Sequence, residues 1–468
     1  MVTIQESELK EGILLAIDRA KNDGRPILVS EVRQIAPIDP LLFYYTGKER
    51  FYGERFFWKD PSDEIYLAGN GIINQFQSDQ ATDRFFHVEK AWKRFIENAL
   101  IDNPYKENGV GPLMFGGFSF DPSKEKSGLW SKYGDALFHL SKYMLSVIKG
   151  KTYLTTNVVC TQHDDLSLYH KVMQEREELL NSIPLSMSSE QPHLSDMKEI
   201  SPESWKETVA EILPDLEKGS LKKVVLAREL RLFFEEPAEP EAALSHLNKA
   251  QHESFIFSFE SNGDSFIGAS PERLVKKQGK NIFSTCLAGS IRRGKTEEED
   301  RALGDQLLSD QKNLIEHHYV VEMIREALEE TCKRVEMPDQ PQLLKIRDIQ
   351  HLYTPVVGIS KEDASLIQMV ERLHPTPALG GLPKYEAVEK IRSVEELDRG
   401  FYAAPLGWMD YKGNGEFAVA IRSALLQGKE ASLFAGCGVV SDSDPESEFL
   451  ETSLKFRPML NALGGNQS

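Results

Sequence analysis

The sequence of 468 residues is poor in cysteine, and its cysteines form no pattern that indicates a metal site. There are four of them, with no C-x-x-C pair and no Cys/His cluster at the spacing of zinc ligands. A structural zinc site and a disulfide framework are therefore not indicated. Because disulfides are rare where thiols are kept reduced, scattered cysteines fit a reducing compartment best.

The sequence also lacks a long hydrophobic run near its beginning. The apolar residues 13–17 are followed by Asp18 and Arg19, so the run is too short for a signal peptide or a membrane span. We therefore expect a cytoplasmic protein that has no membrane partner.

Positive charge is in deficit. The 55 lysines and arginines are outnumbered by 73 aspartates and glutamates, which gives a formal net charge of −18. This balance argues against a general affinity for nucleic acid or for anionic membranes. If the ligand of this protein is an anion, its binding site has to be locally cationic.

The order of the expected elements favours an α+β fold. The polar, proline-containing residues 183–200 resemble a linker or a long surface loop. After them, strand-like runs alternate with glycine turns, and two long helical patterns, 297–335 and 365–373, interrupt the strands. Helices that are grouped rather than strictly alternating with strands predict antiparallel sheets instead of a doubly wound fold.

A stretch near the C-terminus joins an apolar strand to a charged helix. The strand is expected to break at Gly436 and Gly438, and a Ser/Asp/Pro turn then opens the helix. On that helix Glu448, Glu451 and Lys455 recur at i, i+3 and i+7 and share one face. By itself this face could be a solvated stripe, because a Glu–Lys pair at i, i+4 contributes only about 0.2–0.5 kcal/mol.

Three further residues lie at the ends of expected strands. Lys223 begins the apolar segment K-V-V-L-A-R, and Glu272 follows a strand that is expected to stop at Gly268 before a Ser-Pro turn. Gly289 ends another strand, where backbone amides can approach a ligand closely. Taken singly, each has an ordinary structural interpretation: an edge lysine, a turn carboxylate and a turn glycine.

Glu316 and Arg422 are charged residues in apolar patterns. Glu316 interrupts the apolar stripe of a long helix, and it is either a ligand for a hard cation or a flank of that stripe. Arg422 lies inside an apolar alternation, where a charge is costly unless it is paired. This arginine therefore needs a carboxylate, from the protein or from a substrate.

The order of these motifs is far more specific than any one of them. From residue 223 the sequence carries, in turn, K-V-V-L-A-R, G-x-S-P-E, L-A-G-S, K-x-x-x-E-H, H-P-T-P-A-L-G-G, I-R, G-x-G-V-V and E-x-x-E-T-x-x-K. In this respect the chain resembles the chorismate-utilising enzymes, which include isochorismate, salicylate, anthranilate and aminodeoxychorismate synthases. The resemblance is dense from about residue 201 to the end and diffuse before it.

The resemblance implies a large single chorismate-binding fold of the α+β class, with antiparallel β-sheets in the core and helices packed outside. Within it we expect residues 1–195 to form a strand-rich N-terminal lobe without a catalytic motif. Residues 196–468 are expected to form the catalytic, chorismate-binding region.

The resemblance also implies roles for residues of this chain. Mg²⁺ is expected at Glu316 and Glu451, with Glu448 acting through water, which agrees with the preference of this ion for few carboxylates and several waters. Arg422 and Tyr402 match the pair that holds the pyruvyl carboxylate of chorismate.

Three more positions match substrate contacts of the family. Lys455 and the backbone of Gly289 match contacts near the ring carboxylate of chorismate. His351 matches a position that lies near the leaving group in the members with lyase activity.

Two positions set the expected reaction. Members that add ammonia or an amine carry glutamine at the position of Lys223, and aminodeoxychorismate synthases carry a nucleophilic lysine at the position of Ala288. This chain therefore resembles the members that add water. On this interpretation neutral Lys223 takes a proton from a water that attacks C2 of chorismate, and Glu272 protonates the departing C4 hydroxyl, which yields isochorismate.

Other functions stay open at this point. A salicylate synthase would also carry Lys223, although the segment around Ala378 and Leu379 resembles isochorismate synthases more. An amination subunit is disfavoured by Lys223, so no obligate glutaminase partner is expected. A non-catalytic module for metals and anions would not need both Lys223 and Glu272, and a glycosidase finds no support. The long N-terminal half resembles the menaquinone-pathway enzymes.

Overall fold

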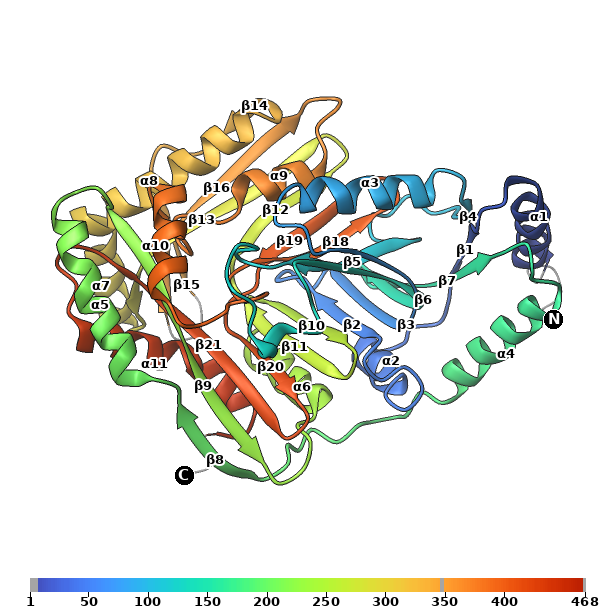
Figure 1. Ribbon diagram of the computed structural model, residues 1–468, viewed down its shortest axis with the longest axis horizontal. Coiled ribbons are helices and arrows are strands. Elements are labelled where there is room, and N and C mark those ends of the chain that lie inside the picture. The colour runs from blue at the N-terminus through green and yellow to red at the C-terminus, as the bar shows by residue number, and fades with distance from the viewer. Residues whose placement is uncertain (1–6, 346–348, 466–468) are drawn as a thin grey trace.

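Strands occupy the middle of the molecule, and most helices lie on its outer faces (Figure 1). The computed structural model describes residues 7–345 and 349–465. The strands of these residues are β1 (Ile27–Gln34), β2 (Arg55–Lys59), β3 (Ile65–Ser78), β4 (Leu100–Asp102), β5 (Leu113–Phe118), β6 (Ala136–Ile148), β7 (Lys151–Cys160), β8 (Leu194–Glu199), β9 (Lys223–Phe234), β10 (Phe255–Ser261), β11 (Asp264–Ser270), β12 (Arg273–Gln278), β13 (Asn281–Arg292), β14 (Cys332–Glu336), β15 (Gln342–Lys345), β16 (Ile349–Ser360), β17 (Gly381–Leu382), β18 (Pro405–Asp410), β19 (Gly415–Val419), β20 (Ser423–Gln427) and β21 (Glu430–Val439).

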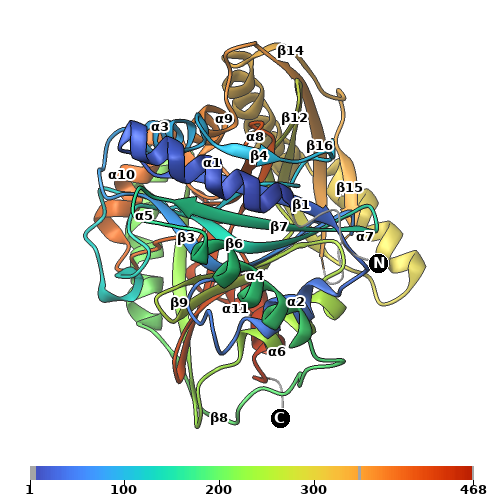
Figure 2. The same ribbon diagram turned by 90° about the vertical axis from the view of Figure 1, so that its right-hand side faces the viewer.

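The helices pack around these strands. They are α1 (Ser7–Asp23), α2 (Pro40–Thr46), α3 (Arg84–Ile96), α4 (Ser167–Asn181), α5 (Pro202–Glu217), α6 (Pro240–Ala250), α7 (Glu297–Ser309), α8 (Gln311–Glu329), α9 (Leu366–Leu373), α10 (Lys384–Val394) and α11 (Pro445–Ala462), with a short 3₁₀ turn η1 (Gly128–Trp130). Helix α1 lies across β1 and β7 at the N-terminal side (Figure 2).

Hydrogen bonding joins the described strands into one network. Among their pairings only β1 with β4 is parallel, and long antiparallel pairs such as β9–β21 and β3–β6 make up the centre. The expected fold class, α+β with antiparallel sheets in the core and helices outside, is confirmed. Two groups of buried apolar side chains fill the space between the sheets and the helices.

The early and late parts of the chain share these sheets. Strand β2 pairs with β10, and β5 pairs with β18. The expected linker, residues 183–200, contains β8, which pairs with β9. Strands from both sides of residue 195 pair with one another, so this position does not divide the sheets. The assignment of catalysis to residues 196–468 stays a prediction.

The helical pattern at 297–335 is two helices followed by a strand, rather than one long helix. Helix α7 ends at Ser309, and Asp310 has an extended backbone (φ −73°, ψ 108°). The Asp310 side chain accepts a hydrogen bond from the N–H of Asn313 at 2.8 Å and so caps α8. This break sets the direction of α8, which carries Glu316 into the site described below.

The glycines at which we expected strands to end lie inside strands instead. Gly436 and Gly438 lie inside β21, Gly268 lies inside β11, and β13 continues past Gly289. At Gly438 the reason is space, since a Cβ would lie 2.3 Å from Cε of Lys223. At Gly289 the reason is conformation, because φ is +80° where the register with β16 shifts.

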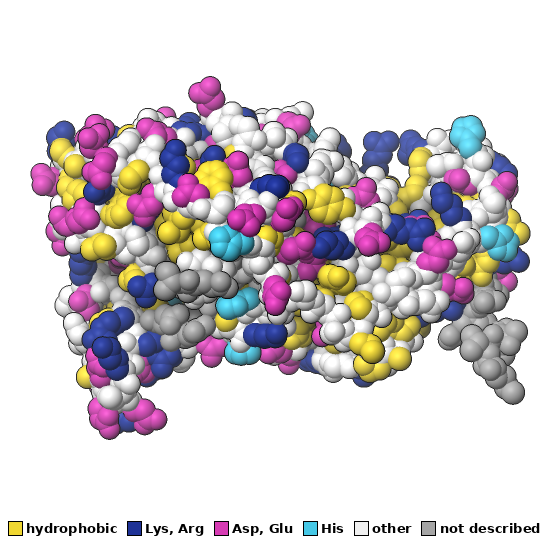
Figure 3. Space-filling view, turned by 90° about the horizontal axis from the view of Figure 1, so that it is seen from below, with side chains coloured by type: hydrophobic (Ala, Val, Ile, Leu, Met, Phe, Trp, Pro, Cys, Tyr) yellow, Lys and Arg dark blue, Asp and Glu magenta, His cyan; other side chains and the backbone are white. Residues whose placement is uncertain are grey.

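The surface carries both signs of charge. On the face shown in Figure 3, lysine and arginine side chains are interspersed with aspartates and glutamates. Within 7–345 and 349–465, no helix has the length and apolar content that crossing a membrane requires.

Candidate active site

One cavity collects nearly all of the predicted site residues. It has a volume of about 240 Å³ and lies among β9, β13, β16, β21, α8 and α11. Nine of the ten predicted residues line it: Lys223, Glu272, Gly289, Glu316, His351, Tyr402, Arg422, Glu451 and Lys455. The tenth, Glu448, is not part of the lining and accepts a hydrogen bond from Ser443 Oγ at 2.7 Å.

Lys223 is buried at the first position of β9. Its side chain reaches the cavity through the space that Gly438 leaves free on the neighbouring strand β21. Nζ donates to Oε1 of Glu316 at 2.6 Å. An ammonium that donates in this way has no lone pair with which to accept a proton, so the ion pair has to open before Lys223 can act as a base.

Glu272 is a buried carboxyl group between β11 and β12. Burial raises its pKa to about 7, although the charges of Lys223 and Arg422 and the nearby Thr376 hydroxyl all act to lower it. Its backbone N–H donates to Ser270 Oγ at 3.2 Å, which fixes the turn. A carboxylic acid with this pKa still carries a proton in a large fraction of molecules near neutral pH, as a general acid must.

Arg422 lies between β19 and β20 with a left-handed backbone, at φ 51°. Burial lowers the pKa of its guanidinium, and the nearby Tyr402, Glu451 and Glu272 act against that effect. Its side chain makes no hydrogen bond or ion pair with another described residue. An unpaired guanidinium in a strained position of a cavity is placed to bind a ligand carboxylate through two parallel hydrogen bonds.

Tyr402 lies beside this arginine in the same cavity. Its ring stacks on Phe434, with centroids 5.4 Å apart and an interplanar angle of 30°. Burial raises the pKa of its phenol, so the hydroxyl keeps its proton and can donate. A Cβ at Gly436 would lie 3.3 Å from this hydroxyl, so glycine in β21 leaves room for it.

His351 is neutral although two cations lie close to it. Burial, together with the charges of Arg422 and Lys455, lowers its pKa to about 3, despite a hydrogen bond with the backbone of Gly289. Lys455 Nζ donates to the carbonyl of Gly436 at 2.9 Å and to Glu451 at 2.6 Å. The cavity therefore sets three basic side chains against the carboxyl groups of Glu272, Glu316 and Glu451. Both lysines are in ion pairs, so among the described residues Arg422 is the basic group left for an anionic ligand.

Glu316 and Glu451 offer carboxylates to one cavity from two different helices, α8 and α11. Each is paired with a lysine, Glu316 with Lys223 and Glu451 with Lys455, so a metal ion bound there would take the place of an ammonium group. Within the described part of the chain, no three His, Cys, Asp or Glu side chains form a cluster that could hold a metal. Two carboxylates fit Mg²⁺, which keeps several waters and shares its coordination with the substrate, better than Zn²⁺.

Two further residues of the site were missed by the sequence analysis. Asn313 lines the cavity one turn before Glu316 on α8, and Thr376 lies near Glu272 outside the lining, where its hydroxyl has no hydrogen-bond partner among the described residues. Both lie within motifs noted in the sequence, the K-x-x-x-E-H and H-P-T-P-A-L-G-G segments. Their positions in these motifs could have indicated the two residues, but only the fold shows which neighbours surround each of them.

Comparisons with known proteins agree with this geometry. Residues 15–464 match the family model described as chorismate binding enzyme. Isochorismate synthase MenF of Bacillus subtilis (strain 168) is 41% identical over 472 residues, covering 100% of both chains. The salicylate biosynthesis isochorismate synthase of Pseudomonas aeruginosa is 34% identical over 460 residues and covers 96% of this chain and 94% of its own.

The solved structures show the same architecture. MenF, the menaquinone-specific isochorismate synthase from Escherichia coli, matches with a TM-score of 0.78 over 97% of this chain and 100% of that one. At 23% identity this match establishes the fold alone. Because the family model spans most of the sequence and a relative is 41% identical over its full length, the chain belongs to the chorismate-binding enzyme family.

Proposed function

We propose that this chain is an isochorismate synthase, an isomerase that converts chorismate to isochorismate. The observation that carries the proposal is that Lys223 and the buried acid Glu272 line one cavity together with the unpaired Arg422. The full-length similarity to MenF of B. subtilis supports the same activity and a place in menaquinone biosynthesis.

We assign one proton transfer to each of two residues, to Lys223 at C2 of chorismate and to Glu272 at C4. Lys223 accepts a proton from the water whose oxygen bonds to C2, the ring double bond shifts, and the C4–O bond breaks. Glu272 gives its proton to the departing hydroxyl, which leaves as water. One water enters and one leaves, so product and substrate have the same mass.

The other cavity residues would bind the two carboxylates of chorismate. Arg422 and Tyr402 are assigned to the pyruvyl carboxylate, since both are free to donate to it. Lys455 and the backbone of Gly289 are assigned to the ring carboxylate, with neutral His351 beside them.

Glu316 and Glu451 would hold Mg²⁺, with Glu448 contributing through water. When bound, the ion would neutralise the ring carboxylate, which these acidic side chains would otherwise repel. We assign the catalytic role to residues 196–468 and a supporting role to residues 1–195, in a cytoplasmic enzyme that needs no glutaminase partner.

The direct test is to incubate the purified protein with chorismate, with and without Mg²⁺, and to identify the products by chromatography and mass. We expect a Mg²⁺-dependent mixture of chorismate and an isomer of equal mass, without pyruvate. Salicylate with stoichiometric pyruvate would instead establish a salicylate synthase. An aromatic amine formed with ammonia would establish an amination subunit, and the absence of turnover would leave a binding module.

A further inference from the structure

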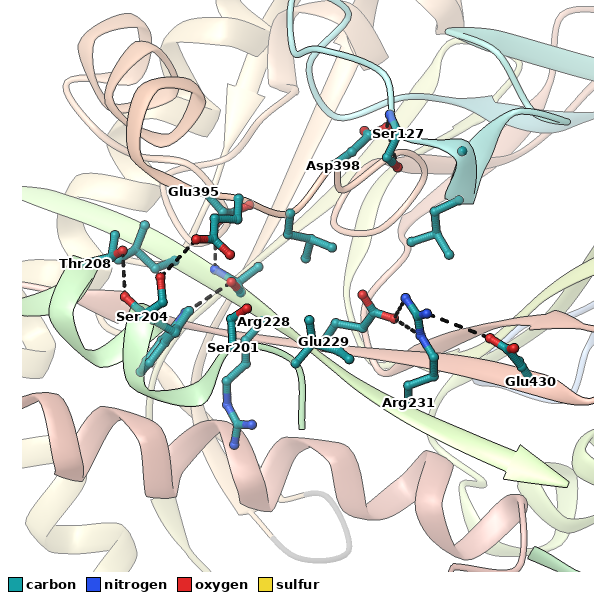
Figure 4. A pocket seen from close by; sticks show the side chains of 18 of the residues that line it. Ser127, Ser201, Ser204, Thr208, Arg228, Glu229, Arg231, Glu395, Asp398 and Glu430 are labelled. Carbon is teal, nitrogen blue, oxygen red and sulfur yellow. Dashed lines mark hydrogen bonds and ion pairs between the residues drawn. The ribbon is translucent and has the colours of Figure 1, made fainter. Parts of the chain in front are cut away.

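One edge of β9 has no neighbouring strand between Val225 and Glu229, although the Val225 N–H donates to the Gly380 carbonyl and the Glu229 carbonyl accepts from the Ile200 N–H. Strand β17 pairs with the beginning of β9, and β8 pairs with it only from Leu230 onward. A cavity of about 510 Å³ opens beside this gap, lined in part by Ala227 and Glu395 (Figure 4). Backbone groups of β9 along the gap need hydrogen-bond partners, because unpaired buried N–H and C=O groups are costly.

Side chains take the place of the missing strand. Glu395 Oε2 accepts from the N–H of Ala227 at 2.8 Å, and Arg399 Nη2 donates to the carbonyl of Val225 at 2.7 Å. The indole Nε1 of Trp205 donates to the carbonyl of Ala227 at 3.1 Å. Glu395 and Arg399 thus satisfy one N–H and one C=O of β9, as a strand would.

Arg399 also contacts the segment that follows α9, which lies beside β9 at the edge of the active-site cavity. Arg399 Nη1 donates to the carbonyl of Leu379 at 3.0 Å, and both Leu379 and Val225 line that cavity. Lys223 lies two residues before Val225 on β9, and Thr376 beside Glu272 lies three residues before Leu379. Backbone hydrogen bonds already join the two segments, from the Val225 N–H to the Gly380 carbonyl at 2.9 Å and between β9 and β17. The guanidinium of Arg399 adds two further bonds at this junction, and it therefore braces the start of β9, where Lys223 lies.

Burial makes this connection rigid. Each of the two side chains is only 3% exposed, and they are joined by hydrogen bonds of 2.6 and 2.7 Å. Burial acts to lower the pKa of Arg399, but the charge and hydrogen bonds of Glu395, together with the charges of Tyr402 and Asp121, raise that pKa overall, so the arginine stays charged. A buried ion pair of this kind adds little net stability, whereas its fixed geometry orders the groups that it contacts.

We infer that Glu395 and Arg399 are positioning residues that hold the start of β9, and with it Lys223, in its place at the active-site cavity. The inference rests on the proposed isochorismate synthase function. Neither side chain lines the cavity, so the pair acts through Val225, Ala227 and Leu379.

The test compares Arg399→Lys with Arg55→Lys in the full-length protein. Lysine keeps the charge, but its three N–H groups lie on one nitrogen and cannot reach the groups that three separate nitrogens of Arg399 contact. We expect kcat to fall about tenfold to hundredfold, as for small displacements of catalytic groups. The KM for chorismate should stay within about threefold, because Arg422 and Lys455 are held by other elements.

Arg55 provides the matched control. It is buried, it forms ion pairs with Glu241 and Glu260, and it does not line the active-site cavity. Arg55→Lys should lower the unfolding temperature in the same way as Arg399→Lys but leave kcat within about twofold. Equal losses of kcat in both variants would show a general loosening and overturn the inference.

Two other results would also overturn it. One is a kcat for Arg399→Lys within about twofold of the wild type, and the other is a raised KM with unchanged kcat. If Arg399→Lys does not fold, Glu395→Gln replaces it, because the amide can still accept from Ala227, and a loss of kcat of at least about threefold is expected. Failure of the wild-type protein to isomerise chorismate would refute the proposed function itself. That result is distinct from a failure of the positioning inference, in which the wild type is active.

Discussion

Lys223 and Lys222 are adjacent in the sequence but lie in different environments. Lys223 is buried in the cavity, whereas Lys222 is exposed, with its ammonium 4.6 Å from the ring centre of Tyr319. We predict that Lys223→Ala lowers kcat by about 10²–10⁴-fold, because it removes the base, while chorismate and Mg²⁺ still bind. Steady-state kinetics and calorimetry measure the two effects.

Lys222→Ala is the matched control for that variant. It removes the same side chain from the next position and should leave kcat within about twofold, since surface substitutions rarely have large effects. Near wild-type turnover in Lys223→Ala would show that another group accepts the proton.

Glu272 sets the expected pH dependence. An acid with a pKa of about 7 is protonated below that pH and loses its proton above it, so kcat/KM should fall as pH rises through about 7. A profile without a descending limb between about pH 6 and 9 would contradict the assignment.

At the scale of elements, β21 depends on glycine for the space that it leaves to its neighbours. A Cβ at Gly438 would lie 2.3 Å from Cε and 3.0 Å from Nζ of Lys223. We predict that Gly438→Ala folds, because a flexible lysine can move aside, but loses at least about tenfold in kcat through the displaced base. Kinetics combined with thermal unfolding separate these effects.

Gly128→Ala is the control for this variant. A Cβ at Gly128 would meet no atom within 4 Å, so the substitution should change neither activity nor stability appreciably. A Gly438→Ala variant that unfolds without a specific loss of kcat would mean that the glycine serves strand pairing rather than the lysine.

The strands and the helix near these glycines show how far the sequence predicts where an element begins and ends. Strand β9 and helix α11 lie where the apolar pattern and the Asp-Pro start indicate them, with Asp444 accepting from Ser447 as the N-cap. The expected break at Gly436 was wrong, because the sequence cannot tell a glycine that ends a strand from one that makes room for a neighbour. That distinction depends on the side chain opposite, which only pairing of β9 with β21 supplies.

At the scale of the whole molecule, strand pairing ties the two halves of the chain together. Strand β2 pairs with β10 and β5 with β18, and the two core clusters draw residues from both halves. We predict one cooperative unfolding transition, in which circular dichroism and tryptophan fluorescence coincide during a denaturant titration. Two separate transitions would instead support independent lobes on either side of residue 195.

The sequence by itself determined the family and the types and order of the site residues, because motifs and their spacing can be recognised without knowledge of the fold. It also determined that an anion site must be locally cationic, since the chain as a whole carries a net charge of −18. Only the tertiary structure decided that burial raises the pKa of Glu272 and that Arg399 bridges β9 and the segment around Leu379. Both properties arise from burial and from contacts between segments far apart in the chain, and no local pattern encodes them.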